Sequence, residues 1–264
     1  MLAITDHDTI AGVRAAQTAA EHWGITLVPG VEISAVSGQE EIHLLGYFVD
    51  VDNPELKAFV ARAQEARQER AQQILARLAQ WGVPIEWDRV VAKAGGNGSI
   101  GRAHIAATMV EQGYVRSWDE AFEQWIGPGR PAYVERYKLS PEEAIQLVRR
   151  SGGLPALAHP YIFTRNGECK AALDLARWLP RLRDAGLEGI EVYYPNYPHR
   201  LSRQLLTWAI RYGLFISGGS DFHGEGTGSE LGGVAVPWAV WEGLERRHRC
   251  QVRRDLVESG HWLN

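Results

Sequence analysis

The sequence predicts an α/β domain that is interrupted by a helical insertion. Two observations predict this class: short apolar runs alternate with amphipathic segments at both ends of the chain, whereas residues 54–139 show mainly helix-like patterns. The length of 264 residues suits one large α/β domain with an insertion. We therefore expect an α/β domain formed by residues 1–53 and 140–264, with a small helical subdomain at 54–139.

The composition is that of an ordinary globular protein, with 45% hydrophobic residues, 23% charged residues and a net charge of −4. Without a basic excess, we expect no stable binding of duplex nucleic acid, although a nucleotide or a short RNA can still bind locally. No run of 18 apolar residues is present, so we expect no membrane span. Cys169 and Cys250 form no C-x-x-C motif, and two free thiols are typical of the reducing cytoplasm.

The amino-terminal part is expected to fold as strand, helix, strand and strand. Leu2–Ile4 is a short apolar run, and residues 9–23 show helical spacing that ends at Gly24. Residues 25–33 and 42–49 are the next two expected strands. Polar residues stand at or near the ends of these strands, which indicates a site at one rim of a parallel or mixed sheet.

The middle of the chain is expected to be helical, and the α/β alternation then resumes. Helices are predicted at residues 54–81, 87–93, 102–111, 117–126, 140–151, 173–185 and 199–212, and later strands at 154–158, 189–195 and 215–223. Arg67, Arg70 and Arg77 belong to the first of these helices, which is long and charged. We expect them on a solvated face.

The last predicted strand leads into Asp221-Phe222-His223. In extended backbone, residues i and i+2 point to the same face, so Asp221 and His223 are predicted to converge while Phe222 points away. The small residues at positions 217–220 leave space for a ligand to approach the backbone. By itself, a D-x-H motif is a weak signal of a metal site.

Six residues of metal-ligand type follow or interrupt apolar runs. They are His7, Glu32, His43, His159, Asp221 and His223. A single histidine in such a position is more often a satisfied core or surface group. Six at successive strand ends are most simply explained by one cluster, because the carboxyl ends of barrel strands meet at one rim. Imidazole and carboxylate donors suit Zn, Mn or Fe, and clusters of such ions polarise phosphoryl oxygens.

Five motifs in this order resemble the PHP (polymerase and histidinol phosphatase) family. They are A-I-T-D-H-D-T at 3–9, P-G-V-E-I-S at 29–34, I-H-L-L-G-Y at 42–47, A-H-P at 158–160 and G-S-D-F-H-G at 219–224. The resemblance covers nearly the whole chain. It implies a distorted (β/α)7 barrel whose rim holds two or three Mn, Fe or Zn ions and hydrolyses phosphate esters.

The same resemblance implies roles for the six candidate ligands. Glu32 would bridge two ions, and His43 and His159 would complete one of those two sites. Asp221 would bind the other bridged ion. His7 and His223 would hold a third ion.

The helical insertion is similar to that of the PHP subgroup that acts on nucleoside 3',5'-bisphosphates and on short RNA from the 5' end. In that subgroup the insertion covers the active site. Arg102 and His104, in G-R-A-H-I-A, are candidates for phosphate contact, and the forked guanidinium of Arg102 matches phosphate geometry. His104 is also the better candidate for a proton donor, because a metal-binding histidine cannot easily do both jobs. Arg130 is a weaker substrate-binding candidate and reads more simply as a loop surface charge. An ordinary first helical turn is the alternative for Arg102 and His104.

One feature of the family pattern is not found. PHP sequences open with a strand bearing H-x-H, and this chain contains no H-x-H. The barrel is then expected to lack its first strand, through a start site placed too far downstream or a truncated copy. Three functions stay open: a metal-dependent phosphoesterase acting on nucleotides or short oligonucleotides, a catalytically impaired PHP module with a binding or structural role, and a histidinol-phosphate-type phosphatase.

Overall fold

A computed structural model of the chain describes residues 1–38, 40–94, 100–135, 137–163, 168–224 and 229–258. The chain divides into two compact units, each with its own hydrophobic core. The first unit comprises Met1–Lys57 and Leu139–Asn264, and the second comprises Ala58–Lys138. In the described part of the chain, no helix combines the length and the apolar character needed to cross a membrane.

The first unit is built on a mixed sheet with the strand order β1-β2-β3-β4-β7-β8. Its strands are β1 (Leu2–Ile4), β2 (Leu27–Ser37), β3 (Glu40–Tyr47), β4 (Leu154–Leu157), β7 (Gly189–Tyr193) and β8 (Phe215–Gly218). β1 is parallel to β2, and β4, β7 and β8 are parallel to one another, whereas β3 is antiparallel to both of its neighbours. The α/β class predicted from the sequence is confirmed.

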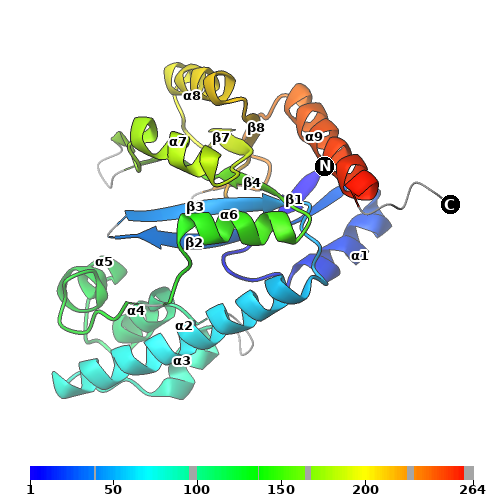
Figure 1. Ribbon diagram of the computed structural model, residues 1–264. Helices are drawn as coiled ribbons and strands as arrows, with labels where there is room; N and C mark the ends of the chain where they lie inside the picture. The colour runs from blue at the N-terminus through cyan, green and yellow to red at the C-terminus, as the bar shows by residue number, and fades with distance from the viewer. Residues whose placement is uncertain (39, 95–99, 136, 164–167, 225–228, 259–264) are drawn as a thin grey trace. The chain divides into compact units, whose positions relative to one another are not determined.

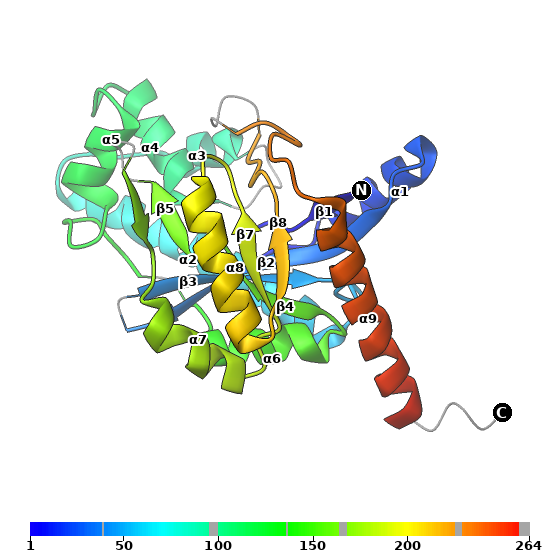
Figure 2. The same cartoon turned by 90° about the horizontal axis from the view of Figure 1, so that it is seen from above.

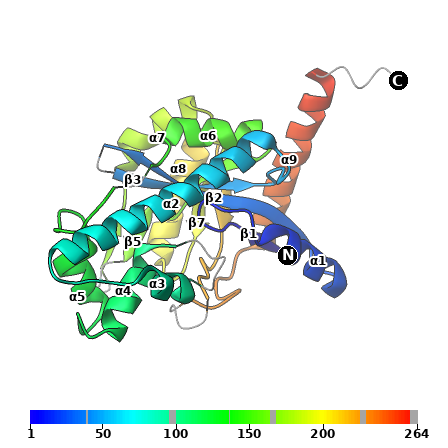
Figure 3. The same cartoon turned by 90° about the horizontal axis from the view of Figure 1, so that it is seen from below.

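Helices cover the sheet because parallel strands need long crossover connections. The helices of this unit are α1 (Val13–Trp23), α6 (Pro141–Arg150), α7 (Leu175–Asp184), α8 (His199–Tyr212) and α9 (Trp238–Glu258). α6 packs on β2, β3 and β4 (Figure 1), and α8 and α9 pack beside β8 (Figure 2). α1 lies against β2 (Figure 3). A separate ribbon is formed by β5 (Tyr161–Phe163) and β6 (Cys169–Ala171).

Two local features hold the central strands in place. Ser140 caps α6, since its hydroxyl accepts a hydrogen bond from the Glu143 N–H while the Glu143 carboxylate accepts one from the Ser140 N–H. Gly30 lets β2 approach its neighbours, because a Cβ atom there would lie 2.7 Å from the Gly46 carbonyl oxygen and 2.7 Å from the Thr5 methyl group. The strands that carry the candidate ligands are therefore closely packed.

The second unit is helical. It contains most of α2 (Pro54–Gln80), together with α3 (Trp87–Lys93), α4 (Arg102–Glu111), α5 (Trp118–Ala121) and the π-helix η1 (Phe122–Ile126). Ile74, Leu78, Ile105 and Met109 are fully buried in its core. The helix predicted at 117–126 is present, but its second half is a π-helix, in which the Gly127 N–H bonds to the Phe122 carbonyl.

Candidate metal centre

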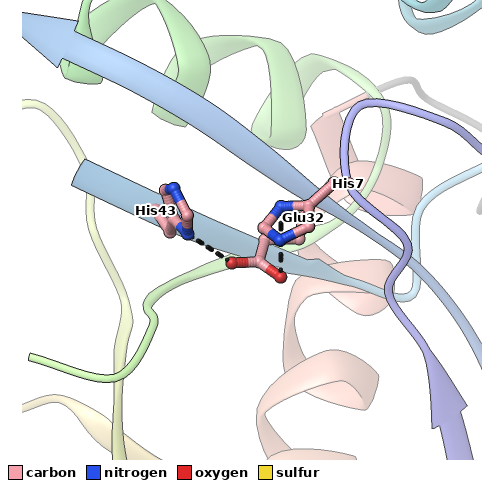
Figure 4. A group of neighbouring side chains, drawn as sticks. All are labelled: His7, Glu32 and His43. Atoms are coloured by element: carbon pink, nitrogen blue, oxygen red, sulfur yellow. Dashed lines mark ion pairs between the residues drawn. The ribbon is translucent and has the colours of Figure 1, made fainter. Parts of the chain in front are cut away.

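The centre of the site is the carboxylate of Glu32, near the middle of β2. Only 3% of this residue is exposed. His7 is its bridge partner, because the Asp8 N–H donates to the Glu32 carbonyl at 2.8 Å and the Glu32 N–H donates to the Asp6 carbonyl at 3.0 Å. Partners in such a bridge point to the same face, and His7 Nδ1 lies 3.5 Å from Glu32 Oε2 (Figure 4).

His43 and His159 approach the other carboxylate oxygen. Glu32 pairs with Leu45 across β2 and β3, and His43 is two residues before Leu45, so its side chain emerges on the same face as that of Glu32. His43 Nδ1 lies 2.8 Å and His159 Nε2 lies 3.1 Å from Glu32 Oε1 (His43 in Figure 4). The two imidazole nitrogens are 3.2 Å apart. Three imidazoles therefore converge on one buried carboxylate.

The protonation states of these groups are strongly linked. Burial alone would raise the pKa of Glu32, but hydrogen bonds from His159 and His43 outweigh it and hold this pKa well below its usual range. Burial likewise opposes protonation of His43, yet its hydrogen bonds to Glu32 and Glu41 raise its pKa to about 9. Burial lowers the pKa of His7. In the protein without ions, Glu32 is thus the fixed negative charge of the cluster.

Asp221 and His223 lie beside this group. The rings of His7 and His223 have centroids 5.4 Å apart, and His223 Nδ1 is 3.5 Å from Asp221 Oδ1. The six candidate ligands predicted from the sequence are therefore neighbours in the first unit.

The route by which Asp221 and His223 meet differs from the prediction. β8 ends at Gly218, and Asp221 has a left-handed backbone with φ of 47°. The expected alternation of an extended strand was wrong here. Irregular backbone joins the two residues instead, and the His223 ring nitrogen Nδ1 lies 2.8 Å from the Asp221 carbonyl oxygen.

A cavity of about 760 Å³ opens beside the cluster. Five of the candidate ligands line it, namely His7, Glu32, His159, Asp221 and His223. Apolar side chains from β2, β3 and α9, including Val28, Leu45 and Leu244, form other parts of its wall. An apolar cavity with a few converging polar groups is typical of a small-molecule site.

The donor set fits divalent transition metals. His7, Glu32 and His43 each offer a ligand atom within 4.8 Å of the others. Among the described residues, the Nδ1 atom of His7 is buried and forms no hydrogen bond, which is costly unless another partner binds it. Imidazole nitrogens and carboxylate oxygens in one cluster are donors that suit Zn, Mn or Fe. The residues present therefore fit a metal centre.

Known proteins with related sequences and folds point to the same chemistry. No family model matches the chain. The 5'-3' exoribonuclease Rnm of Salmonella typhimurium is 35% identical over 91% of this chain and 83% of its own length, and the 3',5'-nucleoside bisphosphate phosphatase of Chromobacterium violaceum is 32% identical over 94% and 87%. A solved structure from Bifidobacterium adolescentis, described as a metal-dependent phosphoesterase, aligns with a TM-score of 0.79 at 33% identity, covering 93% of this chain and 85% of that one. The chain belongs to the PHP family.

As a PHP protein of this group, the chain is a metal-dependent phosphoric ester hydrolase. The six-residue cluster of the first unit is the part of this PHP chain that fits the family's chemistry, because it joins imidazoles and carboxylates at one end of the sheet.

The other three predicted site residues of this PHP chain lie in the second unit. His104 is in the first turn of α4, where its Nδ1 accepts a hydrogen bond from the Gly101 N–H at 3.0 Å. Burial, and then the charge of Arg67, lower the pKa of His104. Arg102 donates to the Ile126 carbonyl at 3.3 Å and lies over the rings of Phe122 and Tyr133. Arg130 is exposed.

The expectation of a solvated face on α2 was wrong for Arg70, and Arg67 is likewise only partly exposed. The Arg70 side chain is partly buried, donates to the Val134 carbonyl at 2.6 Å and lies over the Tyr133 ring. Arg77 also donates to a backbone carbonyl, that of Tyr133. These arginines hold the segment after η1 against α2, a role that charge patterning does not indicate.

Sequence reasoning passed over two partners of the cluster. Glu41 Oε1 lies 3.2 Å from His43 Nε2, so it faces the other side of that ring. Asp8, which is 4% exposed, accepts the Ser34 N–H at 2.9 Å and so ties the loop after β1 to β2. Glu41 was detectable in principle, since it stands two residues before His43 on the same strand face. Asp8 was not, because its contact depends on tertiary pairing.

Proposed function

We propose that this PHP protein hydrolyses phosphate monoesters or diesters of nucleotides or short oligonucleotides. The observation that carries the proposal is the convergence of three imidazoles on the buried Glu32 carboxylate. The names of the relatives support the substrate class, since one is a 5'-3' exoribonuclease and another a 3',5'-nucleoside bisphosphate phosphatase. The free thiols of Cys169 and Cys250 agree with a cytoplasmic location.

The proposed centre holds two or three ions of Mn, Fe or Zn. Glu32 would be a ligand of two of these ions, with His43 and His159 as further ligands of one and Asp221 of the other. His7 and His223 are the proposed ligands of a further ion. In architecture, we propose that residues 1–53 and 140–264 form a distorted (β/α)7 PHP barrel and that residues 54–139 are the helical insertion.

Ions in such a centre would neutralise the charge of a phosphoryl group and lower the pKa of bound water to about 7. The residues of the chain prepare the site for them. Glu32 stays ionised because its imidazole partners hold its pKa low, so it offers both oxygens without first losing a proton. The buried surroundings strengthen each electrostatic contact with the substrate.

Arg102 and His104 are the proposed substrate contacts of the helical insertion. Because His104 Nδ1 accepts the Gly101 N–H, the neutral ring carries its proton on Nε2 and can donate a hydrogen bond from there to a phosphate oxygen or a leaving oxygen. Arg102 keeps its charge and offers a forked set of donors. Arg130 is a weaker third contact, in line with its exposure.

The proposal is tested with the metal-loaded protein. Phosphate release from adenosine 3',5'-bisphosphate, and shortening of a 5'-phosphorylated RNA trinucleotide, are measured with added Mn²⁺ and with EDTA. We expect metal-dependent turnover of at least one substrate. The His43→Gln variant should lose it, whereas His22→Gln, a change at an exposed residue of α1, should keep it.

Three outcomes would contradict the proposal in different ways. Metal binding without turnover of either substrate would leave a PHP module with a binding or structural role. Turnover of histidinol phosphate in place of the nucleotides would move the chain to an amino-acid-pathway phosphatase. Equal turnover by the native protein and His43→Gln would remove the proposed centre itself.

A further inference from the structure

β7 carries none of the six candidate ligands, yet it lies between the two strands that lead to His159 and Asp221. The sheet order places β4 on one side of β7 and β8 on the other. His159 follows the end of β4 by two residues, and Asp221 follows the end of β8 by three. Side chains of β7 can therefore reach both neighbouring strand ends at once.

The first such contact belongs to Glu191. Its Oε2 atom accepts a hydrogen bond from the backbone N–H of His159 at 2.7 Å. Glu191 is 5% exposed and lines the cavity beside the cluster. A carboxylate in such a place is costly, and an apolar residue would pack more cheaply. The hydrogen bond fixes the backbone from which the His159 ring extends.

The second contact belongs to Tyr194, one residue beyond the end of β7. Its hydroxyl donates to Asp221 Oδ2 at 2.7 Å. The bond leaves Oδ1 on the side of His223, at 3.5 Å. The Tyr194 ring also lies near that of His159, with centroids 5.7 Å apart. Tyr194 therefore orients the carboxylate of one candidate ligand while its ring lies beside another.

A bulge explains how both side chains serve the same end of the sheet. In a regular strand, residues i and i+3 point to opposite faces. Glu191 pairs with Ser217 and Tyr193 pairs with Gly218, so β7 advances by two residues where β8 advances by one. Because of the extra residue, Tyr194 points to the same face as Glu191, as residue i+2 of a regular strand would.

We propose that Glu191 and Tyr194 are positioning residues of the metal centre, which hold His159 and Asp221 in the geometry that binds ions. The inference rests on the proposed function for the presence of ions. It concerns β7, which supplies no ligand of its own. Partners that orient metal ligands typically contribute tenfold to hundredfold to metal affinity.

The test measures metal binding rather than turnover. Each protein is stripped of metal and titrated with Zn²⁺ against a chromophoric chelator, and the visible absorption spectrum of its Co²⁺ form is recorded. The variants are Glu191→Ala, Glu191→Gln and Tyr194→Phe. Tyr197→Phe is the matched control, because the Tyr197 hydroxyl bonds to the backbone of Tyr161 and not to a candidate ligand.

We expect Glu191→Ala and Tyr194→Phe to weaken Zn²⁺ binding about tenfold to hundredfold and to alter the Co²⁺ spectrum. Glu191→Gln should retain more affinity than Glu191→Ala, because its amide oxygen can still accept the His159 N–H. Tyr197→Phe should leave both readouts unchanged.

The inference is wrong if both Glu191→Ala and Tyr194→Phe bind Zn²⁺ as tightly as the native protein and keep its Co²⁺ spectrum. It is also wrong if Tyr197→Phe loses as much Zn²⁺ affinity as they do. Should Glu191→Ala fail to fold, Tyr194→Phe decides, since it removes one hydroxyl. A native protein that binds neither ion would overturn the proposed centre and this inference with it. Native binding with unchanged variants would overturn this inference alone.

Discussion

A carboxylate buried as deeply as Glu32 needs partners, and here the partners are imidazoles. His43 and His159 share one of its oxygens while His7 lies beside the other. Removing the charge leaves three imidazoles with no common anion. Loss of Glu32 would affect all three imidazoles, whereas loss of one imidazole would leave Glu32 with the other two.

Replacement of Glu32 by Gln should therefore abolish metal-dependent turnover. We expect a loss in kcat/KM greater than the roughly 10–100-fold effect of removing a residue that only orients a ligand. Metal content per chain and steady-state kinetics with Mn²⁺ measure the change. The control is Glu65→Gln on the exposed face of α2. Full metal content in Glu32→Gln would show that this residue is not a ligand.

The protein without metal should lose stability as the pH rises from about 6.5 to 8. The folded-state pKa values of His43, about 9, and of Glu191, about 8, both lie above their unfolded values, so in this range the folded state keeps protons that the unfolded state has released, and rising pH favours unfolding. Burial is the main cause for Glu191. Urea unfolding in EDTA measures the effect. Glu191→Gln should show a shallower decline, and a flat native profile would refute the expectation.

The six candidate ligands were predictable from the sequence because each follows or interrupts an apolar run at a strand. Their chemistry is local, and strand ends gather residues that are distant in the chain. The partners of these residues were not predictable in the same way. Tyr194 reaches Asp221 only because of a bulge between β7 and β8, and no pattern of apolar and polar residues reveals the pairing of two strands.

Among the secondary-structure elements, β2 contributes most to the position of the site. It pairs with β1 and β3, carries Glu32, and approaches both neighbours closely at Gly30. The sequence predicted the existence of these strands from short apolar runs. It could not give the antiparallel direction of β3, because direction follows from connections and packing rather than from composition.

Gly30→Ala should destabilise the first unit by about 1–3 kcal/mol, since the new methyl group would overlap the Gly46 carbonyl and the Thr5 side chain. Metal affinity should fall as well, because Glu32 is two residues away on the same strand. The matched control is Gly243→Ala in α9, where a methyl group meets nothing within 4 Å. There alanine should be neutral or slightly stabilising. Thermal unfolding of both variants checks the difference.

At the level of the whole molecule, the chain folds as two units with separate cores. The sequence changes near residues 54 and 139 from alternating strand and helix patterns to helix-like patterns alone, and this change was visible before the structure. The π-helix at Phe122–Ile126 was not visible, since its extra residue per turn leaves no mark in composition.

Met109→Ala should destabilise the second unit without changing metal binding by the first. The side chain is fully buried in the helical core, so its loss should cost the second unit about 2–5 kcal/mol. Zn²⁺ affinity of the first unit should remain native. Hydrogen exchange resolved by segment, together with the chelator titration, measures both quantities. Loss of metal affinity equal to that of a ligand variant would show that the cores are not independent.

The bulge in β7 has a consequence for how this protein can diverge. Tyr194 stands three positions after Glu191, and with the bulge this spacing directs both side chains toward one end of the sheet. Insertion or deletion of one amino acid in the interval would turn one of them to the opposite side, whichever side chains were present. Evolution can therefore exchange the identities at these two places more readily than it can alter the count between them.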